Sequence, residues 1–197
     1  MSARVQRRGP GSQAGELHPT HEDLLNAAMR VAERTGLDGL SVNEVTREAG
    51  VAKGTFYLHF ADRDTLLVRL HQRFHDELLE GIVERTASLE PGADRAQARI
   101  TAFLNGCRQQ VAVRAILLQA RSQPAIMSEV ARRNSEAAAL LLDDLIGRIE
   151  YPAETAVLLV AATAEVALNE LQAGSDLPRL RAALFGLVPH PPNPTDS

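Results

Sequence analysis

The sequence predicts an all-α protein, and three observations support this fold class. The apolar residues are mainly Leu, Ala and Val, while aromatic residues make up only 4% of the chain and Trp is absent, a composition typical of helical cores. Apolar residues recur at helical spacing, and no stretch alternates as a half-buried strand does. Pro124, Pro152 and Pro178 each stand where a helix would begin, a position at which the missing N–H costs little.

The first predicted helix begins at Thr20 or His21. Glu22 and Asp23 lie in its first turn, where carboxylates oppose the helix dipole. Gly36 ends the helix as its C-terminal cap. The expected core-facing stripe consists of Leu24, Leu25, Ala28, Val31 and Ala32.

The second predicted helix is short and begins at Ser41. Because Glu44 follows three residues later, a capping box is expected, in which each side chain bonds the other residue's backbone N–H. The helix ends at Gly50. Its expected inward residues are Val42, Val45 and Ala49.

The third predicted helix spans 53–60, and a longer fourth helix follows it. Phe56 and Phe60 are four residues apart and share one helical face, so they are expected to anchor the third helix to the core. Asp62 caps the fourth helix, which continues toward Val83. Its expected apolar residues are Leu66, Leu67 and Leu70.

The remainder of the chain is predicted to form a larger helical bundle. Its helices are expected at about 94–111, 114–121, 125–149, 153–173 and 177–188. The predicted organisation is a disordered, mildly basic tail at 1–19, a compact unit at 20–75, a bundle at 76–188 and a disordered tail at 189–197.

Composition excludes several classes of function. The net charge of −4 gives no overall field that attracts nucleic acid or an anionic membrane. A single cysteine, Cys107, excludes an internal disulfide and a Cys-based zinc site and suits a reducing cytosol. The longest apolar run, 156–168, is shorter than the about 20 residues that span a bilayer. No phosphate loop, nucleophile elbow or HExxH motif is present, so we expect a cytoplasmic protein that is not an enzyme and has no cofactor or metal.

Two short helices joined by a glycine-containing turn predict a helix-turn-helix, whose second helix can lie in the DNA major groove. On the helix at 53–60, the face opposite the Phe pair is small at its centre and polar at its edges. Lys53, the only lysine of the chain, can reach a phosphate or a guanine edge. Tyr57 and His59 can donate to phosphate oxygens. The alternative is that these side chains merely pack.

The stretch 40–67, LSVNEVTREAGVAKGTFYLHFADRDTLL, together with Ala27, Ala28 and Gly36, resembles the N-terminal domain of the tetracycline-repressor (TetR) family of bacterial transcriptional regulators. The resemblance extends over 20–74. One departure is Ala52, because the family often has Ser as the cap of this recognition helix. Losing that cap costs around 1 kcal/mol of local helix stability.

The resemblance implies a DNA-contacting role for nine residues. Those expected to face the major groove are Lys53, Gly54, Thr55, Leu58 and His59. Those expected to hold the phosphate backbone are Ser41, Asn43, Tyr57 and Arg63. Because the unit at 20–63 is not basic, few phosphate contacts per subunit are expected, doubled by dimerisation.

The resemblance also implies that the C-terminal bundle dimerises and binds a small-molecule effector. From the residues alone, the helix at 153–173 is apolar nearly all round, so we expect it to be buried on two sides. With the last helix it would form a four-helix dimer interface, although a purely internal core is the alternative. The interface is expected to contain Ala161, Ala164, Leu168, Leu180 and Leu184.

The effector pocket has a weaker signature, namely polar or soft groups within apolar helical stretches. The candidates are Phe103, Cys107, Gln119, Glu165 and Asn169. Such groups also pair with one another or lie at a wet helix edge. His71 and His75, four residues apart, are expected to lie on a solvated helix face and to bind no metal.

These observations predict a homodimeric, ligand-responsive transcriptional regulator that acts as a repressor. Its expected partners are double-stranded DNA, a second copy of the chain and an unknown small molecule, and no membrane is expected. The alternatives are a helical interaction protein of the same fold without an effector, and an enzyme. The effector, the operator and the sign of regulation are not predicted.

Overall fold

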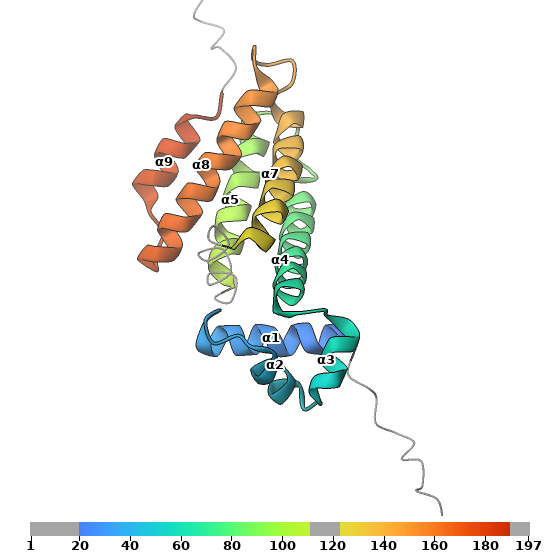
Figure 1. The fold of residues 1–197 in the computed structure, drawn as a ribbon. Coiled ribbons are helices and arrows are strands. Elements are labelled where there is room, and N and C mark those ends of the chain that lie inside the picture. The colour runs from blue at the N-terminus through green and yellow to red at the C-terminus, as the bar shows by residue number, and fades with distance from the viewer. Residues whose placement is uncertain (1–19, 111–122, 190–197) are drawn as a thin grey trace, which may run out of the picture.

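The computed structural model describes residues 20–110 and 123–189, which contain helices and no strand. In Figure 1 a small N-terminal group of helices lies at one end of a longer, roughly parallel bundle. The helices are α1 (His21–Thr35), α2 (Val42–Ala49), α3 (Lys53–His59), α4 (Arg63–Thr86), α5 (Ala93–Gln109), α7 (Pro124–Leu145), α8 (Pro152–Ala173) and α9 (Pro178–Gly186). The all-α prediction is confirmed.

Local capping sets the N-terminal helix boundaries as the sequence indicates. Thr20 and Asp23 form a reciprocal capping box at α1, and Gly36 ends that helix at φ 67°. The Ser41 hydroxyl accepts a hydrogen bond from the Glu44 N–H at 3.2 Å. The second half of the predicted box is not observed, because the Glu44 carboxylate pairs with Arg47.

The buried apolar side chains divide into two clusters along α4. The N-terminal cluster packs α1, α2 and α3 against the first turns of α4, as far as Leu70. The C-terminal cluster begins at Phe74 and joins α4 with α5, α7, α8 and α9. Ile126, at the start of α7, is an exception because it is fully buried in the N-terminal cluster. Two helices, α4 and α7, therefore connect both cores.

Three helices of the bundle end earlier than predicted, and the one predicted over 94–111 ends at Gln109. The helix predicted over 125–149 ends at Leu145, where Ile146 turns to an extended backbone and Gly147 takes a φ of 73°. The last helix ends at Gly186 rather than 188. The predicted helix at 114–121 and the two predicted tails lie outside the described residues, except for Pro189.

Among the described residues, α8 is one helix whose length and composition would allow it to cross a membrane. In the structure, 44% of its most apolar stretch is buried inside the molecule. Figure 1 shows α8 lying along α7 and α9, and core helices of ordinary helical domains pass the same length test.

Candidate nucleic-acid interface and effector cavity

The short helix α3 is held to the core by one aromatic face and leaves the other open. Phe56 and Phe60 are 0% and 1% exposed, and their ring centroids lie 5.4 Å apart. The opposite face presents Leu58 at 83% and Tyr57 at 56% exposure. Both side chains are therefore accessible from outside on the face opposite the Phe pair.

The other predicted groove-facing residues share this open face. Lys53, Gly54 and His59 are exposed and Thr55 is half-buried. No described residue forms an ion pair with Lys53, so its ammonium is available to a phosphate or a base edge. A Cβ placed on Gly54 would meet no atom within 4 Å, so the space beside this residue is open.

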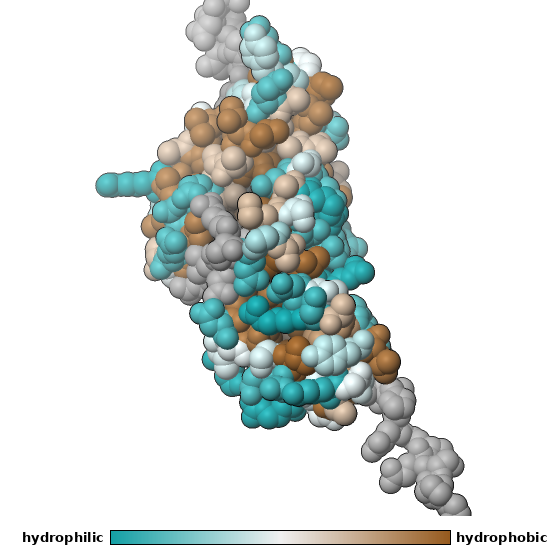
Figure 2. All heavy atoms as spheres, in the orientation of Figure 1, coloured by the Kyte–Doolittle hydropathy of each residue, from teal (hydrophilic) through white to brown (hydrophobic). Residues whose placement is uncertain are grey.

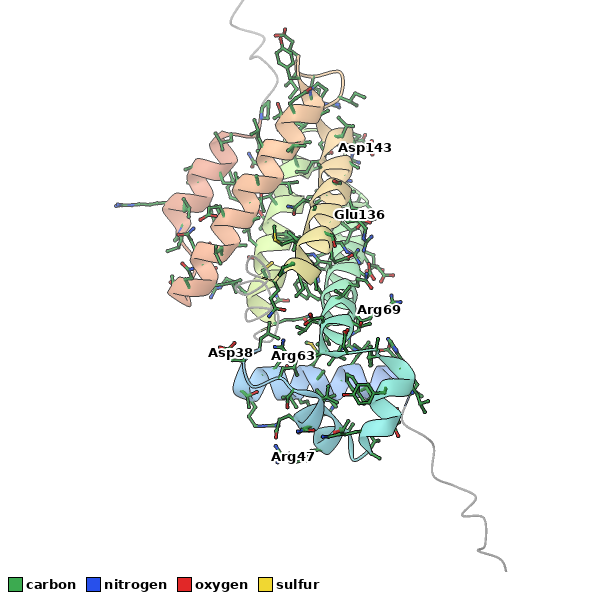
Figure 3. The ribbon with its side chains drawn as sticks, in the orientation of Figure 1. Asp38, Arg47, Arg63, Arg69, Glu136 and Asp143 are labelled. Atoms are coloured by element: carbon green, nitrogen blue, oxygen red, sulfur yellow. The ribbon has the colours of Figure 1, made fainter. Side chains whose placement is uncertain are left out.

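The remaining predicted DNA contacts come from the starts of α2 and α4. Asn43 is exposed in the first turn of α2, and Ser41 is half-buried with its hydroxyl engaged in the cap. Arg63 lies at the junction between the N-terminal helices and α4 (Figure 3). Its guanidinium donates to the carbonyls of Leu40 at 2.6 Å and Leu37 at 2.8 Å. Arg63 therefore braces the loop between α1 and α2, and its phosphate contact stays a prediction.

Most other cations near this interface are paired within the domain. Arg30 and Arg34 both bond Glu48, at 2.8 and 3.1 Å, and so join α1 to α2. The hydrogen bond from Arg30, with that from Arg34, lowers the pKa of the Glu48 carboxyl below its ordinary value. Arg47 is paired with Glu44 on α2. These partners are up to 18 residues apart, and the sequence pattern did not indicate them.

A cavity of about 420 Å³ lies in the C-terminal bundle, between α4, α5, α7 and α8. Its walls are mainly apolar. Its lining residues are His71, His75, Phe103, Met127, Val130, Ala131, Arg133, Asn134, Ala161, Ala164, Ala167, Leu168 and Leu171. A smaller cavity of about 80 Å³ shares His75, Phe103 and Arg133 with it. The larger volume is in the range of natural small-molecule sites.

One of the five predicted pocket residues lines this cavity. Phe103 lines both cavities. Cys107 is fully buried in the core but lines neither, and its burial raises the pKa of the thiol to about 12. The Asn169 amide donates to the Glu165 carboxylate at 3.1 Å, so these two residues pair along α8 outside the cavity. Gln119 lies outside the described residues.

His71 and His75 do not lie on a solvated face, contrary to the prediction. His71 is 1% exposed, and both imidazoles line the larger cavity. Burial lowers the pKa of His71 to about 4 and that of His75 to about 3, so both rings are neutral at pH 7. The sequence showed the two histidines as an i, i+4 pair, but their burial depends on the packing of α7 against α4.

The five residues predicted for the dimer interface do not share one surface. Ala161, Ala164 and Leu168 line the cavity, and Leu184 is 3% exposed in the core of its own subunit. Of the five, Leu180 is the large side chain with substantial exposure, at 37%. Leu184 is therefore not a surface contact, because it turns inward at the end of α9.

Other apolar side chains of α8 and α9 are more exposed than the predicted set. Leu158 is 69% exposed and Val157 59% on α8, and Leu187 is 60% exposed directly after α9. Figure 2 shows apolar surface gathered on the visible face of the upper bundle, where α8 runs. Sequence periodicity missed these positions because α8 is apolar on nearly all sides.

Helices α2 and α3 form a helix-turn-helix whose second helix has an open face, and α4 joins this unit to a bundle that contains a cavity. This arrangement is that of a class of DNA-binding regulatory proteins. Residues 24–70 match the family described as "Bacterial regulatory proteins, tetR family". The segment 24–70 is therefore of this family's type, in agreement with the resemblance of its sequence.

The curated relatives match only part of this chain. The uncharacterized HTH-type transcriptional regulator YvdT of Bacillus subtilis is 34% identical over 65 residues, which are 33% of this chain and 34% of YvdT. The fatty acid metabolism regulator protein of the same organism is 29% identical over 76 residues, 36% of this chain and 39% of that protein. Across the first three relatives, the match spans only 34–50% of their lengths.

Solved structures match over nearly the whole fold. A transcriptional regulator from Rhodococcus sp. Rha1 superposes with a TM-score of 0.69 at 26% identity, over 85% of this chain and 93% of that one. The multidrug binding protein EbrR complexed with malachite green superposes with a TM-score of 0.69 at 27% identity, over 86% and 98%. The likeness includes the helical C-terminal domain, for which the curated relatives give little information.

Proposed function

We propose that the protein is a ligand-responsive transcriptional repressor of the cytoplasm that binds a palindromic operator as a homodimer. The observation that carries this proposal is the open face of α3. Phe56 and Phe60 fix the helix while Lys53 and Gly54 remain accessible. The change of core cluster between Leu70 and Phe74 supports a division a few residues before the one proposed between 20–75 and 76–188.

A regulator of this kind should recognise an inverted repeat. One short recognition helix with few cationic contacts is too little for tight binding by a single subunit. A dimer with two-fold symmetry then requires two half-sites whose separation is about one helical turn of DNA, roughly 34–36 Å, or a multiple of that distance. Selection of bound sequences from a random DNA pool tests this. Recovery of no preferred sequence would favour the alternative of a helical interaction protein that does not bind DNA.

Replacing Gly54 with leucine is expected to abolish operator binding while leaving the fold intact. The Cβ of Gly54 faces open space, so the free protein accommodates a larger side chain. In the complex the same side chain would occupy the position of a base edge or backbone. Gel shifts at fixed salt and thermal unfolding would be measured together. Ser135→Leu, on the exposed surface of α7, is the matched control, and equal operator affinity in both variants would refute the assignment of this face.

The dimer is proposed to form through the exposed side of α8 and α9. Leu158 and Leu187, at 69% and 60% exposure, supply apolar area that a monomer would leave in water. Leu180 belongs to the same proposed surface, whereas Leu184 supports the subunit interior. A two-fold axis would bring the same two helices together from both copies.

Arginine at both Leu158 and Leu187 is expected to convert the dimer to a monomer, because it would bury unpaired charge at the interface. The monomer should fold normally and lose operator affinity although its helix-turn-helix is unchanged. Sedimentation and gel shifts would be compared with Ser135→Arg, an exposed control on α7. A double variant that stays dimeric would place the interface elsewhere.

Effector binding is proposed to reach the DNA-binding domain through α4 and α7. Leu67 and Leu70 of α4 pack in the N-terminal core, and His71 of the same helix lines the cavity. On α7, Ile126 is buried in the N-terminal core and Met127 lines the cavity. If effector and operator favour different arrangements of these helices, each weakens the other's binding by the same factor.

A further inference from the structure

The effector cavity has a polar end that nothing in the described protein satisfies. Both ring nitrogens of His71 and Nε2 of His75 are buried without a hydrogen-bond partner among the described residues. The two ring centroids lie 4.3 Å apart on successive turns of α4. A buried donor or acceptor left unpaired is energetically costly, and native structures contain few of them. Both rings line the cavity, so a bound molecule can supply the missing partners.

The charged groups around this end are already neutralised in pairs. Glu129 is 6% exposed and accepts hydrogen bonds from Arg132, Arg133 and Gln72. Arg133 also pairs with Asp76 and with Glu136, and donates to the carbonyl of Gln72. Within the described residues, the cavity lining therefore offers neither an unpaired carboxylate to a cation nor an unpaired guanidinium to an anion.

The protonation state of the histidines agrees with an uncharged site. Their depressed pKa values keep both rings neutral across pH 6–8, and burial is the main cause. A neutral imidazole presents one N–H donor and one acceptor nitrogen. A hydroxyl group likewise donates once and accepts, so it complements two neutral imidazoles, whereas a charged group here would lose its water without gaining a counter-ion.

We propose that this cavity binds an uncharged, largely apolar molecule whose hydroxyl group hydrogen-bonds with His71 and His75. The apolar body would lie against Phe103, Met127 and Leu168. The inference names the ligand class of the proposed effector site and rests on that proposed function. Binding to the cavity can nevertheless be measured without DNA.

The test uses four probes that share one apolar body: 2-naphthol, naphthalene, 2-naphthoate and 2-naphthyltrimethylammonium. Dissociation constants would be measured by calorimetry on the full chain at pH 7. We expect 2-naphthol to bind at least about 10-fold more tightly than naphthalene, which corresponds to roughly one net buried hydrogen bond. The anion and the cation are expected to bind more weakly than naphthalene. Absence of 2-naphthol binding, or tighter binding of either ion, overturns the proposal.

Variants identify the residues that recognise the hydroxyl group. His71→Phe and His75→Phe should each reduce the preference for 2-naphthol over naphthalene, while binding of naphthalene confirms that the cavity is intact. Gln172→Ala, at an exposed position of α8, should keep the preference. In the parent protein, 2-naphthol affinity should be constant between pH 8 and pH 6, because both rings stay neutral there. A preference that survives both histidine variants overturns the proposal.

The ligand class of the cavity and the regulatory role of the protein can be refuted independently of each other. If the probes rank as expected but 2-naphthol leaves operator affinity unchanged, the ligand class stands and the effector role fails for that ligand. If the protein binds its operator but shows no preference for the hydroxyl group, the regulator stands and this ligand class is refuted.

Discussion

Phe60→Ala is expected to unfold the DNA-binding domain and abolish operator binding. Phe60 is 1% exposed, and its ring centroid lies 5.4 Å from that of Phe56 and 4.4 Å from that of His21. Truncating a buried Phe costs about 3–5 kcal/mol, a large share of the roughly 5–15 kcal/mol that stabilises a typical domain. The C-terminal core does not include Phe60 and should persist.

Thermal unfolding followed by circular dichroism should therefore show an early transition for the N-terminal helices and a later one for the bundle. Leu58→Ala is the matched control, because Leu58 lies two residues earlier at 83% exposure and its loss should change stability by no more than about 0.5 kcal/mol. A single transition at the parent temperature in the Phe60 variant would show that the aromatic pair does not anchor α3.

The N-terminal helices could be predicted because their signals are local. Thr20 caps α1 and Asp62 caps α4, Gly36 and Gly50 end α1 and α2, and each cap acts within a few residues of its helix. The open face of α3 followed in the same way from the spacing of its two Phe residues. These local signals also produced the specific resemblance to a known family.

The role of Arg63 could not be predicted from local pattern. Its guanidinium donates to carbonyls 23 and 26 residues earlier in the chain, and only the folded loop brings them together. A phosphate contact and this brace both require an arginine at the start of α4. The sequence alone therefore does not distinguish them.

The faces of α8 were ambiguous for a different reason. Since this helix is apolar nearly all round, no periodicity separates the side that lines the cavity, such as Ala164, from the side that is exposed, such as Leu158. Leu184, predicted for the dimer interface, is buried in the core of its own subunit. His71 similarly needed the tertiary packing of α7 to be recognised as buried.

A buried carboxylate at the far end of the bundle holds α5 against α7. Asp144 is 1% exposed and accepts a hydrogen bond from Arg99 at 2.7 Å and another from Arg95. Arg99 is itself only 8% exposed and also donates to the carbonyl of Leu140. Two cations from α5 therefore depend on one carboxylate from α7.

Asp144→Ala is expected to destabilise the C-terminal bundle by about 3–5 kcal/mol, because removing one partner leaves buried guanidinium charge uncompensated. Asp143→Ala removes the same charge one residue earlier at an exposed position (Figure 3) and should change stability by no more than about 0.5 kcal/mol. Urea unfolding of the two variants and the parent gives the comparison. If both variants lost the same stability, the effect would come from net charge alone. A loss confined to Asp144 would establish this buried cluster as the link between α5 and α7.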